Sequence, residues 1–412
     1  MLTVRPFRAI RPTKEYAARV AALPYDVMNS DEARAMAADN PHSFLHVDKA
    51  EIDLPPGTDP YDATVYEKAR ENYANLQSNG ILKQDEESHF YIYRLTMDGR
   101  AQTGIVGCPS ADDYIEGRIK KHELTRADKE ADRIRHVDAL NANTGPIFLT
   151  HRPDAALEQI KSDWTAKHAP LYDFMSVEGV RNEAWIVDDA RVIANLAQIL
   201  AGMDALYIAD GHHRCASAIR VARMRREANP GYTGDEEFNY FLAVLFSSDE
   251  LRILDYNRVV RDLNGLDGDA FLARVGERFD ITTADSPVRP EHPHVFGMYL
   301  KNRWYRLTAR PLTWKDTDPV ARLDVSILQD NLLSPILGVE DPRTNARIDF
   351  IGGIRGVEEL EKRVHADMAV AFSLHPTSVD ELMDIADAGQ VMPPKSTWFE
   401  PKLLSGLFVH AL

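Results

Sequence analysis

The chain has 412 residues, and its 48 Lys and Arg stand against 64 Asp and Glu, which gives a formal net charge of −16. With 44% hydrophobic and 27% charged residues the composition is that of a folded protein, which excludes a disordered tail or a fibrous chain. The acidic balance argues against nucleic acid as a partner, and the longest apolar run, Tyr240 to Phe246, is too short to cross a membrane. Two cysteines exclude a disulfide framework, and no apolar segment follows the first arginines, so we expect a cytoplasmic protein without a secretory signal.

The N-terminal part is predicted to mix helices and strands. Helices are expected over 30–38 and 61–77, with a short strand at 43–47 between them. Strands at 90–96 and 103–108 flank Asp98-Gly99, a dipeptide that favours the type I′ turn of a hairpin. We therefore predict an antiparallel pair there.

Strands and helices alternate through the rest of the chain. Strands are predicted at 147–150, 185–187, 206–209, 238–246 and 253–260, helices at 190–200 and 215–228, and a hairpin at 295–300 and 304–308. This pattern predicts a fold between mixed α/β and α+β. We divide it into a mixed α/β core, residues 1–262, and an α+β portion, residues 263–412, whose C-terminal segment returns to the core.

The most informative segment is Asp210-Gly211-His212-His213-Arg214, which lies between an apolar strand and a helix. Such a turn presents free amide groups at a helix N-terminus, where the helix dipole favours phosphate. Asp210 could orient a histidine or hold Mg²⁺, Gly211 lets a ligand approach the backbone, and Arg214 offers a planar fork for phosphate. The alternative is that Asp210 only caps the helix and the histidines are surface residues. The density of titratable groups at a strand end favours the ligand site.

A second basic segment covers residues 118–136. We predict one helix ending near Glu123 and another starting at Arg126, because Thr125 and Asp128 resemble a capping box. The second helix would carry one cationic stripe, formed by Arg126, Lys129, Arg133 and His136. This stripe could bind the phosphates of a nucleotide, or it could be a solvated face whose charges pair with neighbouring acids.

Three weaker candidates remain. Lys395 lies in a proline-stiffened loop with aromatic neighbours and could contact phosphate, although the segment has no P-loop pattern. Cys215 could be a thiolate nucleophile at a helix start, or simply a buried residue. A zinc site is disfavoured, because the adjacent His212 and His213 point differently and no second zinc motif accompanies them.

Six segments in one order resemble the bacterial family of domain of unknown function 1015. They are Pro24-Tyr25-Asp26-Val27, Asn40-Pro41-His42-Ser43-Phe44-Leu45, Lys120-Lys121-His122-Glu123, Thr144-Gly145-Pro146-Ile147-Phe148, Asp210-Gly211-His212-His213-Arg214 and Met392-Pro393-Pro394-Lys395-Ser396-Thr397. More distantly, the segment around Asp210 resembles the turn of the ParB and sulfiredoxin-like superfamily, which includes free serine kinases. This resemblance implies a nucleotide-binding core with an added α+β elaboration. The cysteine of sulfiredoxin is replaced here by His212, which argues against redox chemistry.

Taken with the resemblance, these residues predict a nucleotide-dependent phosphotransferase of the free serine kinase type. It would use ATP or ADP with Mg²⁺ and act on a small polar metabolite such as serine. The expected catalytic residues are Asp210, His213, Glu123 and His122, with Asp210 also the metal ligand. The expected nucleotide and phosphate ligands are Gly211, His212, Arg214, Arg126, Lys129, Arg133 and Lys395. A non-catalytic nucleotide-binding regulator and a phosphate-ester hydrolase remain alternatives, no membrane partner is expected, and homo-oligomer formation is left open.

Overall fold

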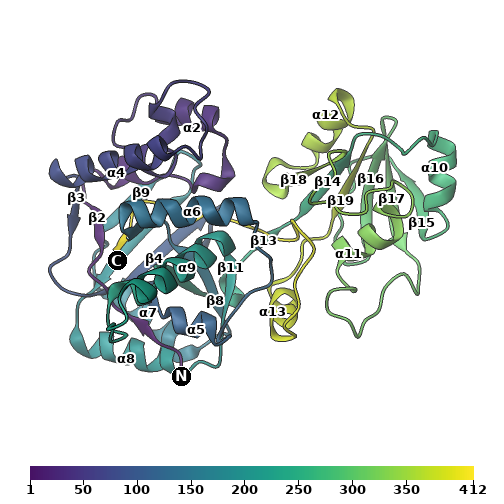
Figure 1. Ribbon diagram of the computed structural model, residues 1–412. Helices are drawn as coiled ribbons and strands as arrows, with labels where there is room; N and C mark the ends of the chain where they lie inside the picture. Colours follow the sequence, from purple (N-terminus) through teal and green to yellow (C-terminus); the bar gives the residue numbers. More distant parts are fainter. The chain divides into compact units, whose positions relative to one another are not determined.

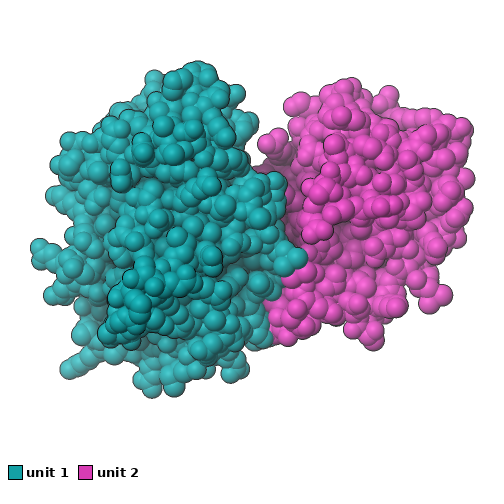
Figure 2. Space-filling view, viewed as in Figure 1, with its two compact units in different colours: residues 1–251, 401–412 teal, residues 252–400 magenta.

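A computed structural model describes residues 1–412 and divides the chain into two compact units (Figure 1). The first unit joins Met1–Leu251 to Pro401–Leu412, and the second comprises Arg252–Glu400 (Figure 2). The predicted mixed α/β fold is confirmed. The division into residues 1–262 and 263–412 stays a prediction. In the structure the first unit ends at Leu251 and resumes at Pro401. No helix is both long and apolar enough to cross a membrane.

The first unit is built on a nine-stranded mixed sheet. Its strands follow the order β6 (Ile119–Lys120), β11 (Leu206–Asp210), β8 (Ile147–His151), β12 (Ala243–Ser247), β5 (Arg100–Pro109), β4 (Phe90–Met97), β10 (Arg181–Val187) and β9 (Tyr172–Met175), with β1 (Val4–Arg5) paired to β5. Pairs β6–β11 and β8–β12 are parallel, and the other pairs are antiparallel. The predicted hairpin at Asp98-Gly99 is confirmed, since both residues have the positive φ that a type I′ turn requires.

Helices and small sheets surround this sheet. The helices are α1 (Ala17–Val20), α2 (Ser30–Ala37), α3 (Leu45–Asp48), α4 (Ala63–Ser78), α5 (Ala111–Ile115), α6 (Ala127–Leu140), α7 (Ala155–Lys167), α8 (Ala190–Ala201) and α9 (His212–Ala228). Helix α6 packs against both α4 and α9 (Figure 1). Two short antiparallel pairs, β2 (Ile10–Pro12) with β3 (Leu82–Gln84) and β7 (Ala142–Asn143) with β21 (His410–Ala411), complete the unit.

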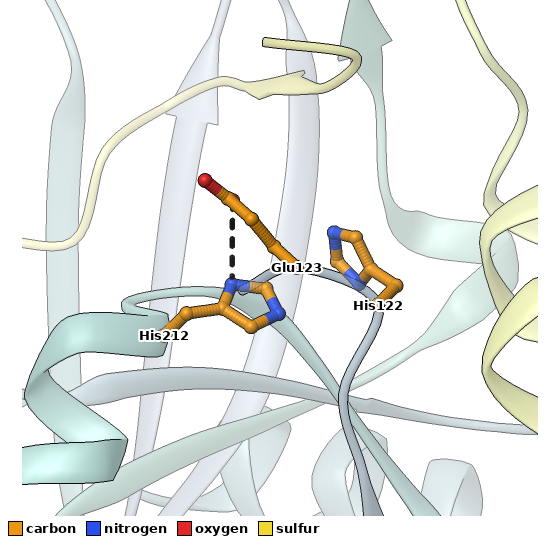
Figure 3. Close-up of side chains that lie close together, drawn as sticks. All are labelled: His122, Glu123 and His212. Atoms are coloured by element: carbon orange, nitrogen blue, oxygen red, sulfur yellow. Dashed lines mark ion pairs between the residues drawn. The ribbon is translucent and has the colours of Figure 1, made fainter. Parts of the chain in front are cut away.

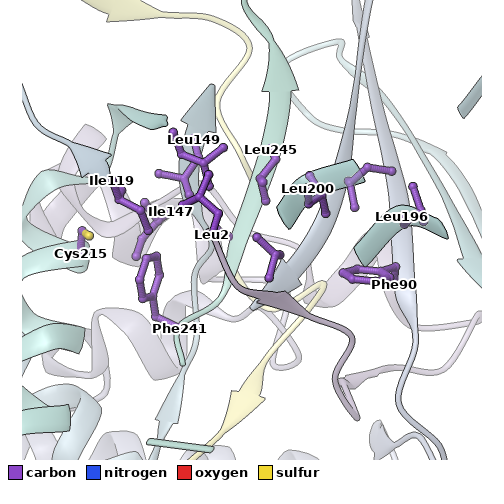
Figure 4. Close-up of a cluster of buried hydrophobic side chains, with 14 of the residues drawn as sticks. Leu2, Phe90, Ile119, Ile147, Leu149, Leu196, Leu200, Cys215, Phe241 and Leu245 are labelled. Atoms are coloured by element: carbon purple, nitrogen blue, oxygen red, sulfur yellow. The ribbon is translucent and has the colours of Figure 1, made fainter. Parts of the chain in front are cut away.

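The alternation of residues along the strands sorts side chains to the two faces of the sheet. On one face, Phe90 of β4, Leu149 of β8 and Leu245 of β12 join side chains of α7, α8 and α9 in one buried cluster (Figure 4). On the other face of the sheet, Tyr91 and Tyr93 of β4 pack against Phe408, and the ring centroids are 5.0 and 5.9 Å apart. The C-terminal segment is therefore anchored to the first unit by aromatic burial.

The second unit is an antiparallel sheet with four helices. The strand order is β15 (Phe279–Ala284), β17 (Arg303–Ala309), β16 (Val295–Leu300), β19 (Val370–Leu374), β14 (Tyr256–Val260) and β18 (Ile348–Gly352). Its helices are α10 (Gly268–Val275), α11 (Asp324–Leu328), α12 (Glu358–Ala366) and α13 (Val379–Asp387). A short pair joins β13 (Ile253–Leu254) to β20 (Trp398–Phe399). Leu360 of α12 packs on Val259 and Ala371 of the sheet, which gives this unit a core of its own.

Some predicted elements are wrong. Residues 43–47 do not form a strand, because Leu45–Asp48 is the helical turn α3 with Leu45 and Val47 buried. A short apolar run does not distinguish a strand from a buried helical turn. The strand expected at 238–246 is reduced to Ala243–Ser247, after a 3-10 turn at Glu237–Asn239, and the one at 253–260 is split into β13 and β14.

The helix predicted to end near Glu123 is also wrong. Residues 118–123 contain the short strand β6 and then a loop. The second helix does start as expected, with Arg126 as the residue before α6, but no side chain caps it. The Thr125 hydroxyl donates instead to Glu130 Oε2 at 2.8 Å, so the predicted capping box is absent.

Candidate functional site

The parallel pairing of β6 with β11 sets the position of the candidate site. Leu206 lies opposite Ile119, and Tyr207 lies opposite Lys120. Parallel strands end at the same edge of a sheet, so the loop after β6 and the turn after β11 meet there. His122 and Glu123 are thereby brought to the start of α9, next to His212.

The turn from β11 into α9 depends on Gly211. This residue has φ 90° and ψ 31°, a left-handed conformation that disfavours any residue with a Cβ. A Cβ built there would lie 3.2 Å from Nε of Arg214, a tight contact from which the arginine side chain would have to shift by a few tenths of an ångström. No side chain caps the helix, whose first backbone N–H groups therefore keep their affinity for an anion. The alternative role of Asp210 as a helix cap is not seen.

Asp210 is held by two donors. Its Oδ2 accepts a hydrogen bond from Nζ of Lys402 at 2.9 Å, and its Oδ1 accepts one from the Gly211 amide at 2.7 Å. Burial by itself would raise the pKa of Asp210, but the nearby charges of Lys402 and Arg214 outweigh it and hold the pKa well below its usual value. The carboxylate is therefore ionised at neutral pH.

His122, Glu123 and His212 form a compact cluster (Figure 3). The two imidazole rings meet edge to face with their centroids 4.4 Å apart, and Nδ1 of His212 lies 3.7 Å from Oε2 of Glu123. Burial lowers the pKa of His122 to about 4, and burial followed by the charge of His122 lowers the pKa of His212 well below its usual value. Both rings are neutral at pH 7, so they offer lone pairs and no positive charge.

His213 and Arg214 point to different partners. Nε2 of His213 accepts a hydrogen bond from the Arg126 backbone amide at 3.0 Å, which ties the start of α9 to the start of α6. Nη1 of Arg214 donates to the Pro146 carbonyl at 2.6 Å, while its Nε is buried without a hydrogen-bond partner. The five-residue turn thus divides its polar groups between the histidine cluster, α6 and a pocket.

A pocket lies where α9, α6 and the segment after β7 meet. Its lining residues are Tyr25, Asp48, Arg133, His136, Val137, Asn143, Thr144, Gly145, Ile147, Arg214, Ser217 and Ala218. The space between its lining atoms is about 400 Å³ when the open solvent at its mouth is included. The guanidinium groups of Arg133 and Arg214 line this space together with the Asp48 carboxylate. Arg133 is already paired with Asp132, so Arg214 is the cation best placed for an anion.

The predicted cationic stripe is divided by the packing of α6. Arg126 is exposed and pairs with Asp128, and Nζ of Lys129 donates to the Tyr61 hydroxyl at 2.8 Å. Arg133 is buried, pairs with Asp132 and lies over the Tyr25 ring at 4.0 Å. His136 is buried as well. Only the C-terminal half of the stripe therefore reaches the pocket, and neither alternative for the stripe describes all of it.

Lys395 and Lys402 belong to different compact units. Lys395, predicted to contact phosphate, belongs to the second unit, where its carbonyl accepts a hydrogen bond from Arg258 and its Nζ lies over the Tyr256 ring. Lys402 was not predicted as a site residue, although it contacts Asp210. Lys402 ends the same proline-rich and aromatic segment, from Met392 to Lys402, in which only Lys395 was predicted to be a site residue. The return of residues 401–412 to the first unit is what places Lys402 beside Asp210.

Cys215 is fully buried in α9, and burial raises the pKa of its thiol. A buried, protonated thiol is a poor nucleophile. The structure therefore favours the alternative stated from the sequence, in which Cys215 is a core residue, and it does belong to the cluster beneath the sheet (Figure 4).

Comparison with known proteins identifies a family and distant structural likenesses. The family model described as protein of unknown function (DUF1015) matches residues 4–326. No curated protein matches the chain.

Among solved structures, a free serine kinase in complex with AMP has 14% identity and a TM-score of 0.36, over 72% of this chain and 86% of the other. SbnI with a C-terminal truncation, from Staphylococcus aureus, has 12% identity and a TM-score of 0.39, over 73% and 85%. A conserved hypothetical protein from Pyrococcus furiosus has 13% identity and a TM-score of 0.36, over 74% and 94%. Such low TM-scores do not establish a common fold, so the function has to be inferred from the side chains.

Proposed function

The chain belongs to the DUF1015 family of proteins of unknown function, and we propose that it is a nucleotide-dependent phosphotransferase acting on a small polar metabolite. The observation that carries the proposal is the anion-binding arrangement beside the β11–α9 turn. There an uncapped helix of 17 residues starts next to a pocket faced by Arg133 and Arg214. In a chain of net charge −16, the guanidinium of Arg214, whose Nε has no partner, favours an anionic group such as phosphate in this pocket, with Arg133 beside it.

The unpaired donor of Arg214 supports a bound anion. Its Nε is buried and has no partner, and leaving such a donor unsatisfied costs about 1–3 kcal/mol. A phosphate oxygen would satisfy it. The fixed hydrogen bond from Nη1 to the Pro146 carbonyl holds the guanidinium in place, so its orientation is set before the ligand binds.

Phosphoryl transfer depends mainly on positioning and on charge neutralisation. In the proposed reaction a hydroxyl oxygen of the metabolite forms a bond to the terminal phosphorus, and the bond from that phosphorus to the bridging oxygen breaks. The hydroxyl proton passes to a base, for which Glu123 is the proposed group and His122 the other one. Arg214, Arg133, Arg126, Lys129 and the amide of His212 would neutralise or contact phosphate oxygens. Gly211 would let the phosphate approach the backbone, because its own amide donates to Asp210, and Lys395 keeps its proposed role in nucleotide binding. Serine is the first acceptor to test.

Asp210 and His213 are proposed to position the reactants. Asp210 stays ionised at neutral pH and could orient the acceptor hydroxyl. As the proposed ligand of a nucleotide-bound Mg²⁺ it would use the lone pairs left by Gly211 and Lys402, since each oxygen already accepts one hydrogen bond. Such a Mg²⁺ would neutralise phosphate charge. His213 would hold the start of α6, with Arg126, against the site.

The test is a turnover assay with ATP or ADP and a panel of hydroxyl metabolites, run on the wild type and on Asp210→Asn. We expect nucleotide consumption that depends on the metabolite, and at least about a 100-fold loss in Asp210→Asn. Asp163→Asn, at an exposed position of α7, is the matched control and should retain activity.

Other outcomes would overturn the proposal. Nucleotide binding without consumption would identify a regulator, and hydrolysis of phosphate esters without nucleotide would identify a hydrolase. Full activity in a folded Asp210→Asn variant would remove Asp210 from the reaction.

A further inference from the structure

We propose that His122, Glu123 and His212 bind one divalent first-row transition-metal ion. These three residues also belong to the proposed phosphotransferase site, in which Glu123 and His122 are the candidate bases, but metal binding is measured without turnover and does not depend on that function. The ligand atoms come from two segments that the parallel pairing of β6 with β11 brings together.

The geometry fits three ligands around one ion. One nitrogen from each histidine and one carboxylate oxygen all lie within 4.8 Å of one another (Figure 3). Around a tetrahedral zinc ion with bonds of about 2.0–2.1 Å, the ligand atoms are roughly 3.3 Å apart. Separations of up to 4.8 Å would shorten by up to about 1.5 Å around such an ion. Glu123 can approach the two buried histidines, because its side chain is 39% exposed and lies in a loop.

The buried ring nitrogens are an independent sign of a ligand. His122 is 1% exposed and His212 is 6% exposed. Nε2 of His212 has no hydrogen-bond partner, and neither nitrogen of His122 makes a hydrogen bond of ordinary geometry, the Ile208 backbone being its one polar contact. Buried polar atoms are almost always paired, so the unsatisfied nitrogens of two adjacent rings call for an explanation. A metal ion would bind one lone pair on each ring and fix the tautomer of both.

The chemical types of the three ligand atoms indicate which class of metal ion would bind. Two imidazoles with one carboxylate suit zinc, iron, manganese, cobalt or nickel, whereas Mg²⁺ and Ca²⁺ prefer oxygen ligands alone. Three protein ligands leave at least one coordination position for water or for an oxygen of a ligand.

The experiment measures metal binding directly on the full chain after chelator treatment. Calorimetry with Zn²⁺ should give one equivalent, and Co²⁺ should develop the visible absorption bands of a tetrahedral site. Mg²⁺ should give neither signal. His212→Ala should weaken Zn²⁺ binding by at least about 100-fold, since even residues behind the ligands contribute 10- to 100-fold.

Two further variants keep the test decisive. Glu123→Gln changes a partly exposed side chain, so it should fold normally and still weaken Zn²⁺ binding, by at least about tenfold. His151→Gln alters another buried histidine of the same sheet with an unpaired ring nitrogen, and should bind Zn²⁺ like the wild type. Absence of a Zn²⁺ equivalent in the wild type would overturn the proposal. Equal Zn²⁺ affinity in wild type and Glu123→Gln would overturn it as well, whatever the turnover assay shows.

Discussion

The contact between Asp210 and Lys402 leads to a quantitative prediction about the first unit. Lys402→Met keeps the length and the apolar part of the side chain but removes the cation that lies 2.9 Å from Asp210 Oδ2. It also removes the polar contact between residues 401–412 and the β11–α9 turn. The side chains are 11% and 29% exposed, so the pair is largely but not fully removed from water.

The expected magnitude follows from this partial burial. With an effective dielectric constant of about 20, two unit charges at this distance attract by roughly 6 kcal/mol, most of which desolvation offsets. Removing one partner of a fully buried pair costs about 3–5 kcal/mol, and an exposed pair contributes only about 0–1 kcal/mol. We therefore expect Lys402→Met to lower the free energy of unfolding by about 2–3 kcal/mol. The coupling energy with Asp210→Asn should be about 1–2 kcal/mol.

Urea unfolding of the wild type, both single variants and the double variant would measure this coupling energy. The pKa of Asp210 is lowered in the folded state, so the pair stabilises above the usual pKa of 3.8 and loses its contribution as the pH falls towards the folded value. The coupling should accordingly decrease below about pH 4. A coupling energy under about 0.5 kcal/mol at pH 7 would refute the reasoning, because it is the value of a solvent-exposed pair.

Three further predictions concern single side chains. Gly211→Ala should destabilise by about 1–2 kcal/mol from its left-handed conformation, and by more from contact with Arg214. Gly234 has a similar φ, but nothing lies within 4 Å of a Cβ built there, so Gly234→Ala is the control. If both variants lose the same free energy of unfolding in urea, the contact of the new methyl group with Arg214 contributes nothing. Burial raises the pKa of Asp324 to about 7, so the folded state holds the proton and its stability should fall by up to about 4 kcal/mol between pH 4 and 7. Asp324→Asn should remove this fall in unfolding experiments, and an unchanged pH profile would contradict the assignment. Cys215 should not react with a thiol reagent in the native protein, and rapid labelling before unfolding would show that its helix opens.

Local patterns were enough for most elements of the fold. The type I′ turn at Asp98-Gly99, the long helices α4 and α9 and the strand before Asp210 are each encoded by neighbouring residues. They were predicted because turn chemistry and hydrophobic periodicity act over a few residues. Residues 43–47 were wrongly predicted as a strand, because this apolar run is too short to distinguish the periodicity of a helix from that of a strand.

The candidate site was only partly predictable. The segment from Asp210 to Arg214 combines several chemical groups at one strand end, and this density is visible in the sequence. Its partners are not, because Lys402 is 192 residues from Asp210 and becomes its neighbour only when Phe408 packs on the sheet. From the sequence a zinc site was disfavoured, because only the adjacent residues His212 and His213 were considered as a pair of ligands. The structure instead places His212 beside His122.

The sequence by itself therefore determined the composition of the chain, the turn after β11 and the residue types available for chemistry. Tertiary structure decided which of these residues meet. Strand pairing set His122 and Glu123 against His212, and the burial of one side of α6 separated Arg133 from Arg126. The physical reason is that local conformation depends on interactions between close neighbours, whereas strand register and burial depend on the free energy of the whole packed unit.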